Sequence, residues 1–134
     1  MTKLLAIEGI GEVYFGKLQA IGIRTVEALL EAGKTPQGRM ELAEKAGVSG
    51  KAILEWVNRA DLFRIRGIAV QYSDLLEKAG VDTVPELAQR RADHLFEKMK
   101  AVNAEKKLVR RLPTLGQVAN WIEQAKALER IITY

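Results

Sequence analysis

The sequence predicts an all-α protein built from two similar units, and three observations carry this prediction. Apolar residues recur at helical spacing, as in Val118, Trp121, Ile122, Ala125 and Leu128. Residues that favour helix starts stand directly before the apolar runs. A set of residues recurs 58 positions along the chain, which is typical of an internal duplication.

In the first half, local signals predict four helical segments in succession. A helix that carries Tyr14 and Leu18 ends at Gly22, and Thr25 caps a short helix after it. Thr35-Pro36 opens a segment that runs to Ala46, and Gly47 stops it. Ser49 starts the helix that contains Trp56.

The second half repeats this order of signals. Gly80 ends one helix, Thr83 with Pro85 caps the next, and Thr114 starts the helix that contains Trp121. The last residues, 130–134, have β-type composition, but the sequence offers them no obvious partner. No segment is a convincing strand.

The internal repeat supports the division into two units. ILEWVNRA, residues 53–60, also matches VANWIEQA, residues 118–125, at a shift of 65. We therefore expect a first unit at 1–62 and a second at 63–134, with an inserted basic helix around Lys106–Leu115. Nine pairs are identical at the shift of 58: Ile7/Ile65, Gly9/Gly67, Ile10/Ile68, Tyr14/Tyr72, Leu18/Leu76, Gly22/Gly80, Thr25/Thr83, Val26/Val84 and Leu29/Leu87.

Composition excludes several classes of function. The 134 residues include no cysteine and one histidine, His94, so thiolate and multi-histidine metal sites are excluded and no cofactor is expected. No apolar run is long enough to span a membrane, and the N-terminus lacks a signal peptide, which favours a cytoplasmic protein. The residues of a catalytic constellation or a nucleotide loop are missing, so we do not expect an enzyme.

The excess of positive over negative charge lies entirely in the second half. Residues 1–62 carry eight Lys/Arg and eight Asp/Glu, whereas residues 63–134 carry thirteen Lys/Arg against nine Asp/Glu. This asymmetry favours an acidic partner, although a solvated surface is the commoner meaning of such charge.

The Gly-Ile-Gly sequence at 9–11 predicts a tight turn between two helical segments. Glycine permits crowded or left-handed backbone, and Ile10 can pack back between the helices. The first N–H groups of the following helix have no intrahelical acceptor, so they form a natural site for an anion.

This pattern resembles the helix-hairpin-helix motif: an apolar residue, Gly-Ile-Gly, a helix with Leu18, then Gly22, Ile23 and Thr25. Each unit is also similar to the small helical domain at the start of RecA-like recombinases of eukaryotes and archaea. Over its full length the chain resembles the tandem helix-hairpin-helix proteins of the domain-of-unknown-function 4332 family. The resemblance implies a SAM-like helical bundle and, more loosely, binding of double-stranded DNA through its backbone.

The resemblance implies which residues would contact phosphates. The backbone amides come from both turns, with Lys17 and six basic side chains of the second half in support. The predicted nucleic-acid site is Gly9, Ile10, Gly11, Lys17, Arg64, Arg66, Gly67, Ile68, Ala69, Lys106, Lys107, Arg110 and Arg111. If helical, the Lys106-Lys107 and Arg110-Arg111 pairs share one face.

Neither turn matches the motif fully. Glu8 and Glu12 flank the first turn, where they oppose an anion, and Ala69 replaces the second glycine of the second turn. A protein-interaction or scaffold module that kept the fold without phosphate binding is therefore the alternative. An adaptor for a small anionic ligand at one turn is a third interpretation.

Overall fold

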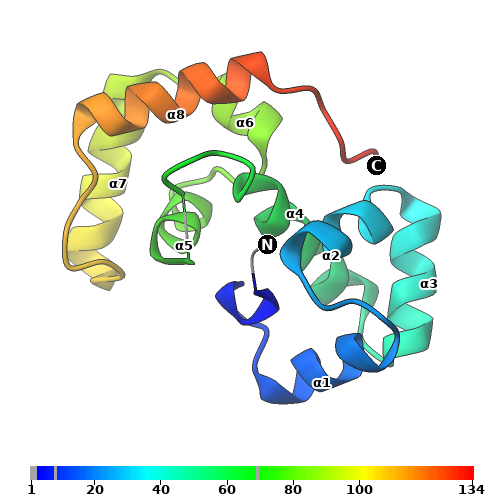
Figure 1. Cartoon of the computed structure of the whole chain (residues 1–134). Coiled ribbons are helices and arrows are strands. Elements are labelled where there is room, and N and C mark those ends of the chain that lie inside the picture. Colours follow the sequence, from blue (N-terminus) through cyan, green and yellow to red (C-terminus); the bar gives the residue numbers. More distant parts are fainter. Residues whose placement is uncertain (1–2, 8, 69) are drawn as a thin grey trace. The chain divides into compact units, whose positions relative to one another are not determined.

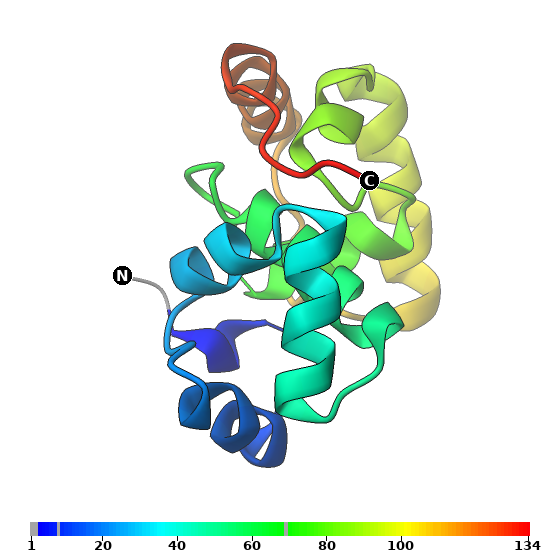
Figure 2. The ribbon, with the colours of Figure 1, turned by 90° about the vertical axis from the view of Figure 1, so that its right-hand side faces the viewer.

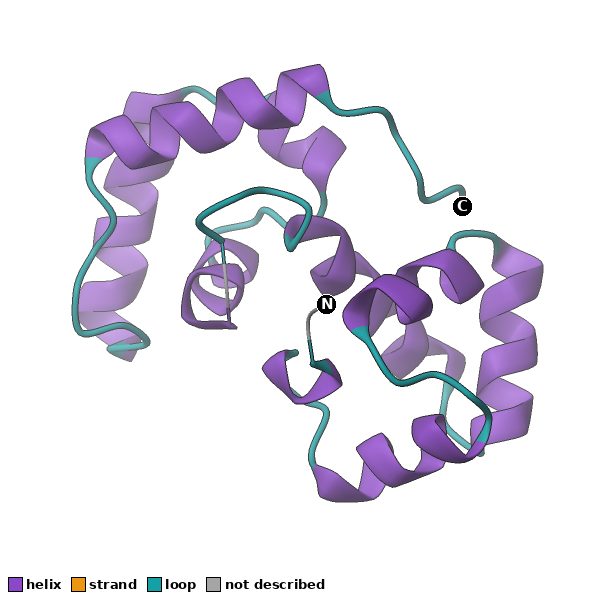
Figure 3. Ribbon diagram, viewed as in Figure 1, coloured by secondary structure: helices purple, strands orange, loops and turns teal. Residues whose placement is uncertain are grey.

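The protein is helical throughout the part of the chain described by its computed structural model, residues 3–7, 9–68 and 70–134. No strand occurs among these residues, and a single isolated bridge joins Lys3 to Thr25. Figure 1 and Figure 3 show helices joined by short loops. The predicted all-α fold class is confirmed.

The chain divides into two compact units, Met1–Asp61 with Ile131–Tyr134, and Leu62–Arg130. The last four residues, which the sequence assigned to the second unit, thus group with the first. The first unit begins with a single 3₁₀ turn, η1, rather than the expected helix ahead of Gly9. Its elements are η1 (Leu4–Ala6), α1 (Glu12–Ala20), α2 (Val26–Gly33), α3 (Pro36–Ala46) and α4 (Gly50–Leu62), which ends at the boundary.

In the first unit α3 packs against both α1 and α2. In the second unit α8 packs against α6 and α7, and α5 packs against α7. The helices of the second unit are α5 (Val70–Lys78), α6 (Val84–Ala88), α7 (Ala92–Lys106) and α8 (Leu115–Ala127).

The predicted helix starts are confirmed by their caps. The hydroxyl oxygens of Thr25 and Thr35 each accept a hydrogen bond from the amide three residues on, at 3.0 Å. Thr83 caps α6 in the same way, and Ser49 precedes α4 and accepts from Ala52. Thr114 and Gln117 form a reciprocal capping box at α8. These local hydrogen bonds fix the helix boundaries because they satisfy amides that lack intrahelical acceptors.

Both tryptophans lie in the core, as their helical spacing predicted. Trp56 is 4% exposed in the first unit and Trp121 is 2% exposed in the second. Ile23 and Val81, which follow the helix-ending glycines, are buried too.

The prediction of an inserted basic helix around Lys106–Leu115 is wrong. Helix α7 ends at Lys106, and Lys107 adopts a left-handed conformation with φ of +52°. The side chain of Asn103 then holds Val109 at both its amide (2.9 Å) and its carbonyl (3.1 Å). These two hydrogen bonds direct the chain away from the helix axis, so residues 107–114 form a loop. Lys106, Lys107, Arg110 and Arg111 therefore share no helical face.

The C-terminal tail, residues 131–134, has a partner that the sequence did not reveal. The Thr133 amide donates to the Lys34 carbonyl at 2.8 Å, and the Thr133 carbonyl accepts from Arg39 Nη2 at 2.8 Å. Ile132 is 3% exposed. In Figure 1 and Figure 2 the tail, drawn in red, ends beside the connection between α2 and α3. The tail is therefore part of the core of the first unit.

Candidate nucleic-acid interface

Each unit contains a glycine turn ahead of its first long helix, formed among the described residues by 7 and 9–11 in the first unit and by 65–68 in the second. Gly9 and Gly67 have φ of +96° and +99°, a region that L side chains rarely adopt. A Cβ on Gly9 would lie 3.3 Å from the indole nitrogen of Trp56. A Cβ on Gly67 would lie 2.8 Å from the indole nitrogen of Trp121. Both turns thus favour glycine for its backbone conformation, and the second turn also favours it for space.

The same tryptophans also contact the helix that follows each turn. Tyr14 lies 5.1 Å from Trp56 and Tyr72 lies 5.3 Å from Trp121, measured between ring centroids, with interplanar angles of 56° and 50°. This tilted geometry is one that aromatic pairs favour. Tyr14 and Tyr72, which are identical in the internal repeat, therefore share one packing role, and each joins the helix after its turn to the last long helix of its unit.

Two of the amides predicted to bind phosphate are already used inside the fold. The Ile10 amide donates to the Ile7 carbonyl at 3.1 Å, and the Ile68 amide donates to the Ile65 carbonyl at 3.2 Å. Both isoleucine side chains are buried, and their burial accompanies the closure of each turn by this hydrogen bond. A phosphate contact at either turn would therefore use neighbouring amides.

The second glycine of the first turn lies in open space. Gly11 is the N-cap of α1, has φ of −88°, and a Cβ there would meet no atom within 4 Å. An anion can therefore approach the start of α1 from this side. Ala69, the corresponding residue of the second turn, and Glu8 both lie outside the described residues.

The described residues at the first turn include an acid at the helix start, and the predicted cation is held elsewhere. Glu12 is the first residue of α1 and is exposed. Lys17 lies over the Tyr14 ring, with Nζ 5.6 Å from the ring centroid. This cation–π contact holds Lys17 a turn further along α1.

The second turn carries Arg66 on an anchored backbone. The Arg66 amide donates to Gln124 Oε1 at 2.9 Å, and Gln124 Nε2 donates to the Arg66 carbonyl at 3.1 Å. The Arg66 side chain itself is exposed. Arg64, by contrast, is half-buried and donates to the Glu129 carbonyl at 2.7 Å, so its guanidinium holds the end of the unit together.

The basic loop, residues 107–114, reaches the helix that follows the second turn. The Tyr72 hydroxyl donates to the Arg111 carbonyl at 3.1 Å, and Tyr72 stands in the first turn of α5. Arg110 and Arg111 are exposed. The structure thus brings Arg111 to the start of α5, while Lys106 and Lys107 lie at the far end of the same connection, where α7 ends.

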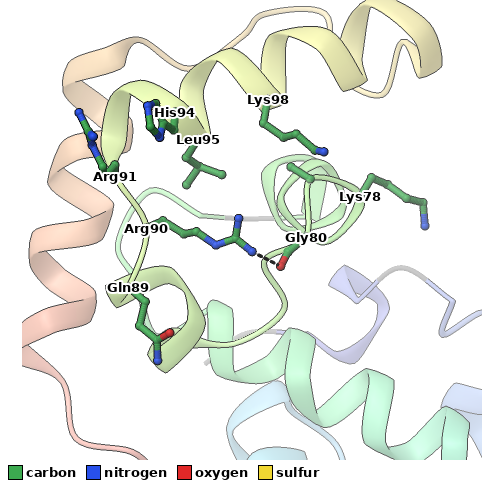
Figure 4. Close-up of a pocket in the computed structure, with 9 residues that line it drawn as sticks. Lys78, Gly80, Gln89, Arg90, Arg91, His94, Leu95 and Lys98 are labelled. Atoms are coloured by element: carbon green, nitrogen blue, oxygen red, sulfur yellow. Dashed lines mark hydrogen bonds between the residues drawn. The ribbon is translucent and has the colours of Figure 1, made fainter.

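Sequence reasoning missed a second group of cations in the second unit. They line an open pocket between the end of α5 and the start of α7, shown in Figure 4. The nucleic-acid site predicted from the sequence includes none of them. The i, i+4 spacing of His94 and Lys98 was the available signal, since it places both on one face of α7.

The described residues contain neither a cluster of metal-ligating side chains nor a helix that could span a membrane. No group of three or more His, Cys, Asp or Glu in the described chain is arranged to hold a metal ion. Among the described helices, none combines the length and apolar character needed to cross a membrane.

Comparisons with known proteins identify a family but no closer relative. Neither the comparison with curated proteins nor that with solved structures gave a significant match. The sequence model of one family matches residues 8–128, which span both glycine turns and all the long helices. The chain therefore belongs to the family described as domain of unknown function DUF4332.

Proposed function

We propose that the protein is a non-enzymatic module that binds the nucleic-acid backbone, without reading base sequence, through the glycine turn of its second unit. Each unit is interpreted as a helix-hairpin-helix, the two being related by duplication. The recurring contacts of Gly9 and Gly67 with tryptophan, and of Tyr14 and Tyr72 with the same indoles, support this interpretation.

One observation carries the proposal: the bond from Tyr72 to the Arg111 carbonyl sets the basic loop beside the start of α5. Arg66 lies on the turn that leads into the same helix, and its side chain is exposed. Exposed arginines are thus carried by the turn and by the loop that meet the start of α5, and the first N–H groups of a helix have no intrahelical acceptor. Guanidinium groups and backbone amides together suit phosphate oxygens, and phosphate contacts carry no sequence information.

The two units would contribute unequally. The first turn has open space at Gly11 but an exposed Glu12 at its helix start. A carboxylate there repels a phosphate and competes for the helix dipole. We therefore assign the contact to the second unit.

The Arg110→Gln/Arg111→Gln variant tests this assignment. We expect about a tenfold loss of affinity for a labelled random-sequence 20-base-pair duplex, because two phosphate contacts are removed. The slope of log affinity against log salt should become shallower by about 1.8, or about 0.9 for each contact. Fluorescence anisotropy at several salt concentrations measures both quantities.

The matched control is Lys45→Gln/Lys51→Gln, which removes the same charge from exposed positions of the first unit. It should keep the parent affinity within about twofold, because these two lysines are not among the proposed phosphate contacts. Equal losses of duplex affinity in the two variants would show that affinity depends only on net charge, which would contradict the proposal. Failure of the parent protein to bind duplex at low salt would reject it outright.

The second candidate function is protein interaction, and the surface of α1 favours it. Val13 is 72% exposed and Tyr14 is 40% exposed on a helix of which only Leu18 is buried. Exposed apolar side chains beside an acidic helix start suit a protein partner better than a phosphate.

A Val13→Asp variant separates this candidate from nucleic-acid binding. Val13 makes little contact with the core, so stability should change by less than about 0.5 kcal/mol. If α1 is a protein-binding face, co-purification of specific partners should be lost while duplex affinity is kept. Retention of the same partners by Val13→Asp would exclude this surface.

A further inference from the structure

An open pocket of about 560 Å³ lies in the second unit, at the opposite end of α5 from the glycine turn. Three segments form it: the end of α5, the connection into α7 and the first two turns of α7 (Figure 4). The lining residues are Lys78, Ala79, Gly80, Gln89, Arg90, Arg91, His94, Leu95 and Lys98.

The pocket is lined by four cations and a histidine, with no carboxylate among the lining residues. The carboxylates that pair with these cations lie outside the pocket lining. Glu86 pairs with Arg90 at 2.7 Å, Asp93 pairs with Arg91 at 3.2 Å, and Glu77 pairs with Lys78 at 2.9 Å. The His94 amide, and then Arg91, lower the pKa of Asp93, so this carboxyl stays ionised at neutral pH.

Arg90 is held in place inside the pocket. Its Nη2 donates to the Gly80 carbonyl at 2.9 Å, and both Nη2 and Nε donate to Glu86 Oε1, at 2.7 and 3.1 Å. Figure 4 shows the guanidinium between Gly80 and α7, in the middle of the lining residues. A guanidinium that is fixed before a ligand arrives loses little side-chain entropy on binding.

Lys98 supplies a cation with no acidic partner among the described residues. The ion pairs on this part of α7 join Asp93 to Arg91 and Glu97 to Lys100. In Figure 4 the Lys98 side chain extends toward the end of α5, and His94 lies one turn earlier on the same helix. A fixed guanidinium and an unopposed ammonium therefore border one cavity.

We propose that this pocket binds a small phosphate-bearing anion, with Arg90 and Lys98 as its principal ligands. With Nε and Nη2 of Arg90 donating to Glu86 and Gly80, its Nη1 group is left to donate to a phosphate oxygen, and lysine adds a point charge to another. The bound anion would neutralise the positive charge of the pocket that the neighbouring carboxylates do not balance. The site is separate from the proposed nucleic-acid contact, because the nine residues of α5 set the two ends about 13 Å apart.

The test is titration of the ¹⁵N-labelled full chain with pyrophosphate, and separately with inorganic phosphate, against sodium chloride of equal ionic strength. We expect saturable amide shifts at Gly80, His94 and Leu95. The Lys98→Gln variant should bind pyrophosphate about fivefold more weakly, as expected for loss of one charged contact. The control Lys100→Gln removes an equal charge from the same helix, outside the pocket, and should bind like the parent.

Three results would overturn the proposal. One is the absence of saturable shifts with either anion, and another is an equal effect of Lys98→Gln and Lys100→Gln. The third is a Lys98→Gln variant that loses duplex affinity as strongly as Arg110→Gln/Arg111→Gln, since the pocket would then belong to the nucleic-acid surface. Failure of duplex binding alone would leave the anion site standing, so the two proposals fail separately.

Discussion

Deletion of the tail, residues 131–134, should lower the free energy of unfolding of the first unit by about 2 to 4 kcal/mol. Ile132 is 3% exposed, and its removal would open an apolar cavity. Arg39, which is 9% exposed, would lose the Thr133 carbonyl and keep its bond to the Gly33 carbonyl at 2.9 Å. A largely buried guanidinium with fewer acceptors is costly, so the loss should exceed that of the apolar contact alone.

The effect should be local to the first unit, because the described tail contacts are with Lys34, Arg39 and Asn58. Hydrogen exchange, resolved by residue, would measure it: amides of α2 and α3 should lose protection while those of α7 and α8 keep theirs. Tyr134→Ala is the matched control. It removes an exposed ring, its 3.0 Å bond to Asn58 and its cation–π contact with Arg39, but keeps the Thr133 carbonyl on Arg39, and should cost under about 1 kcal/mol.

An equal loss of protection in both units would contradict this assignment of the tail. Unchanged protection in α2 and α3 after the deletion would show that Ile132 and Thr133 contribute nothing to the first unit. The Ile132→Ala variant distinguishes the two parts of the effect, since it removes most of the apolar contact and leaves the Arg39 bond in place.

Helix boundaries could be predicted from the sequence because the signals that set them are local. Thr25, Thr35 and Thr114 each bond to an amide three residues away, and that spacing is visible in the sequence. The burial of Trp56 and Trp121 followed from helical periodicity for the same reason.

The loop at 107–114 and the tail at 131–134 could not be predicted because distant partners decide them. The i, i+4 spacing of the four cations suits a helix. The hydrogen bonds of Asn103 with Val109 and of Tyr72 with the Arg111 carbonyl hold these residues in a loop instead. The burial of Ile132 likewise depends on residues near Lys34, about a hundred positions earlier.

The candidate site was predicted only in part. The glycine turns were visible as a repeated pattern, but the internal bonds of Ile10 and Ile68 follow from how their side chains are buried. The basic pocket is formed by three segments between Lys78 and Lys98, and their convergence depends on how α5 packs against α7.

Gly67→Ala should destabilise the second unit by about 3 kcal/mol, and two separate costs contribute. An alanine at φ of +99° is strained, at about 1 to 3 kcal/mol. Its Cβ would also lie 2.8 Å from Trp121 Nε1, so the buried indole must shift, at about 1 to 2 kcal/mol. Unfolding in denaturant, followed by the fluorescence of Trp121 in a Trp56→Phe background, measures the second unit.

Two further glycines separate these costs. Gly9 has nearly the same φ, +96°, but its Cβ would lie 3.3 Å from the Trp56 indole nitrogen, so Gly9→Ala should cost the first unit about 2 kcal/mol. Gly11 has ordinary backbone and open space, so Gly11→Ala should change stability by under about 1 kcal/mol. Equal effects of Gly67→Ala and Gly9→Ala would assign the whole cost to the backbone, and a neutral Gly67→Ala would show that the indole does not restrict the turn. The expected order of destabilisation is Gly67→Ala first, Gly9→Ala second and Gly11→Ala last. This order would establish that each tryptophan restricts the glycine turn that precedes the helix start of its unit.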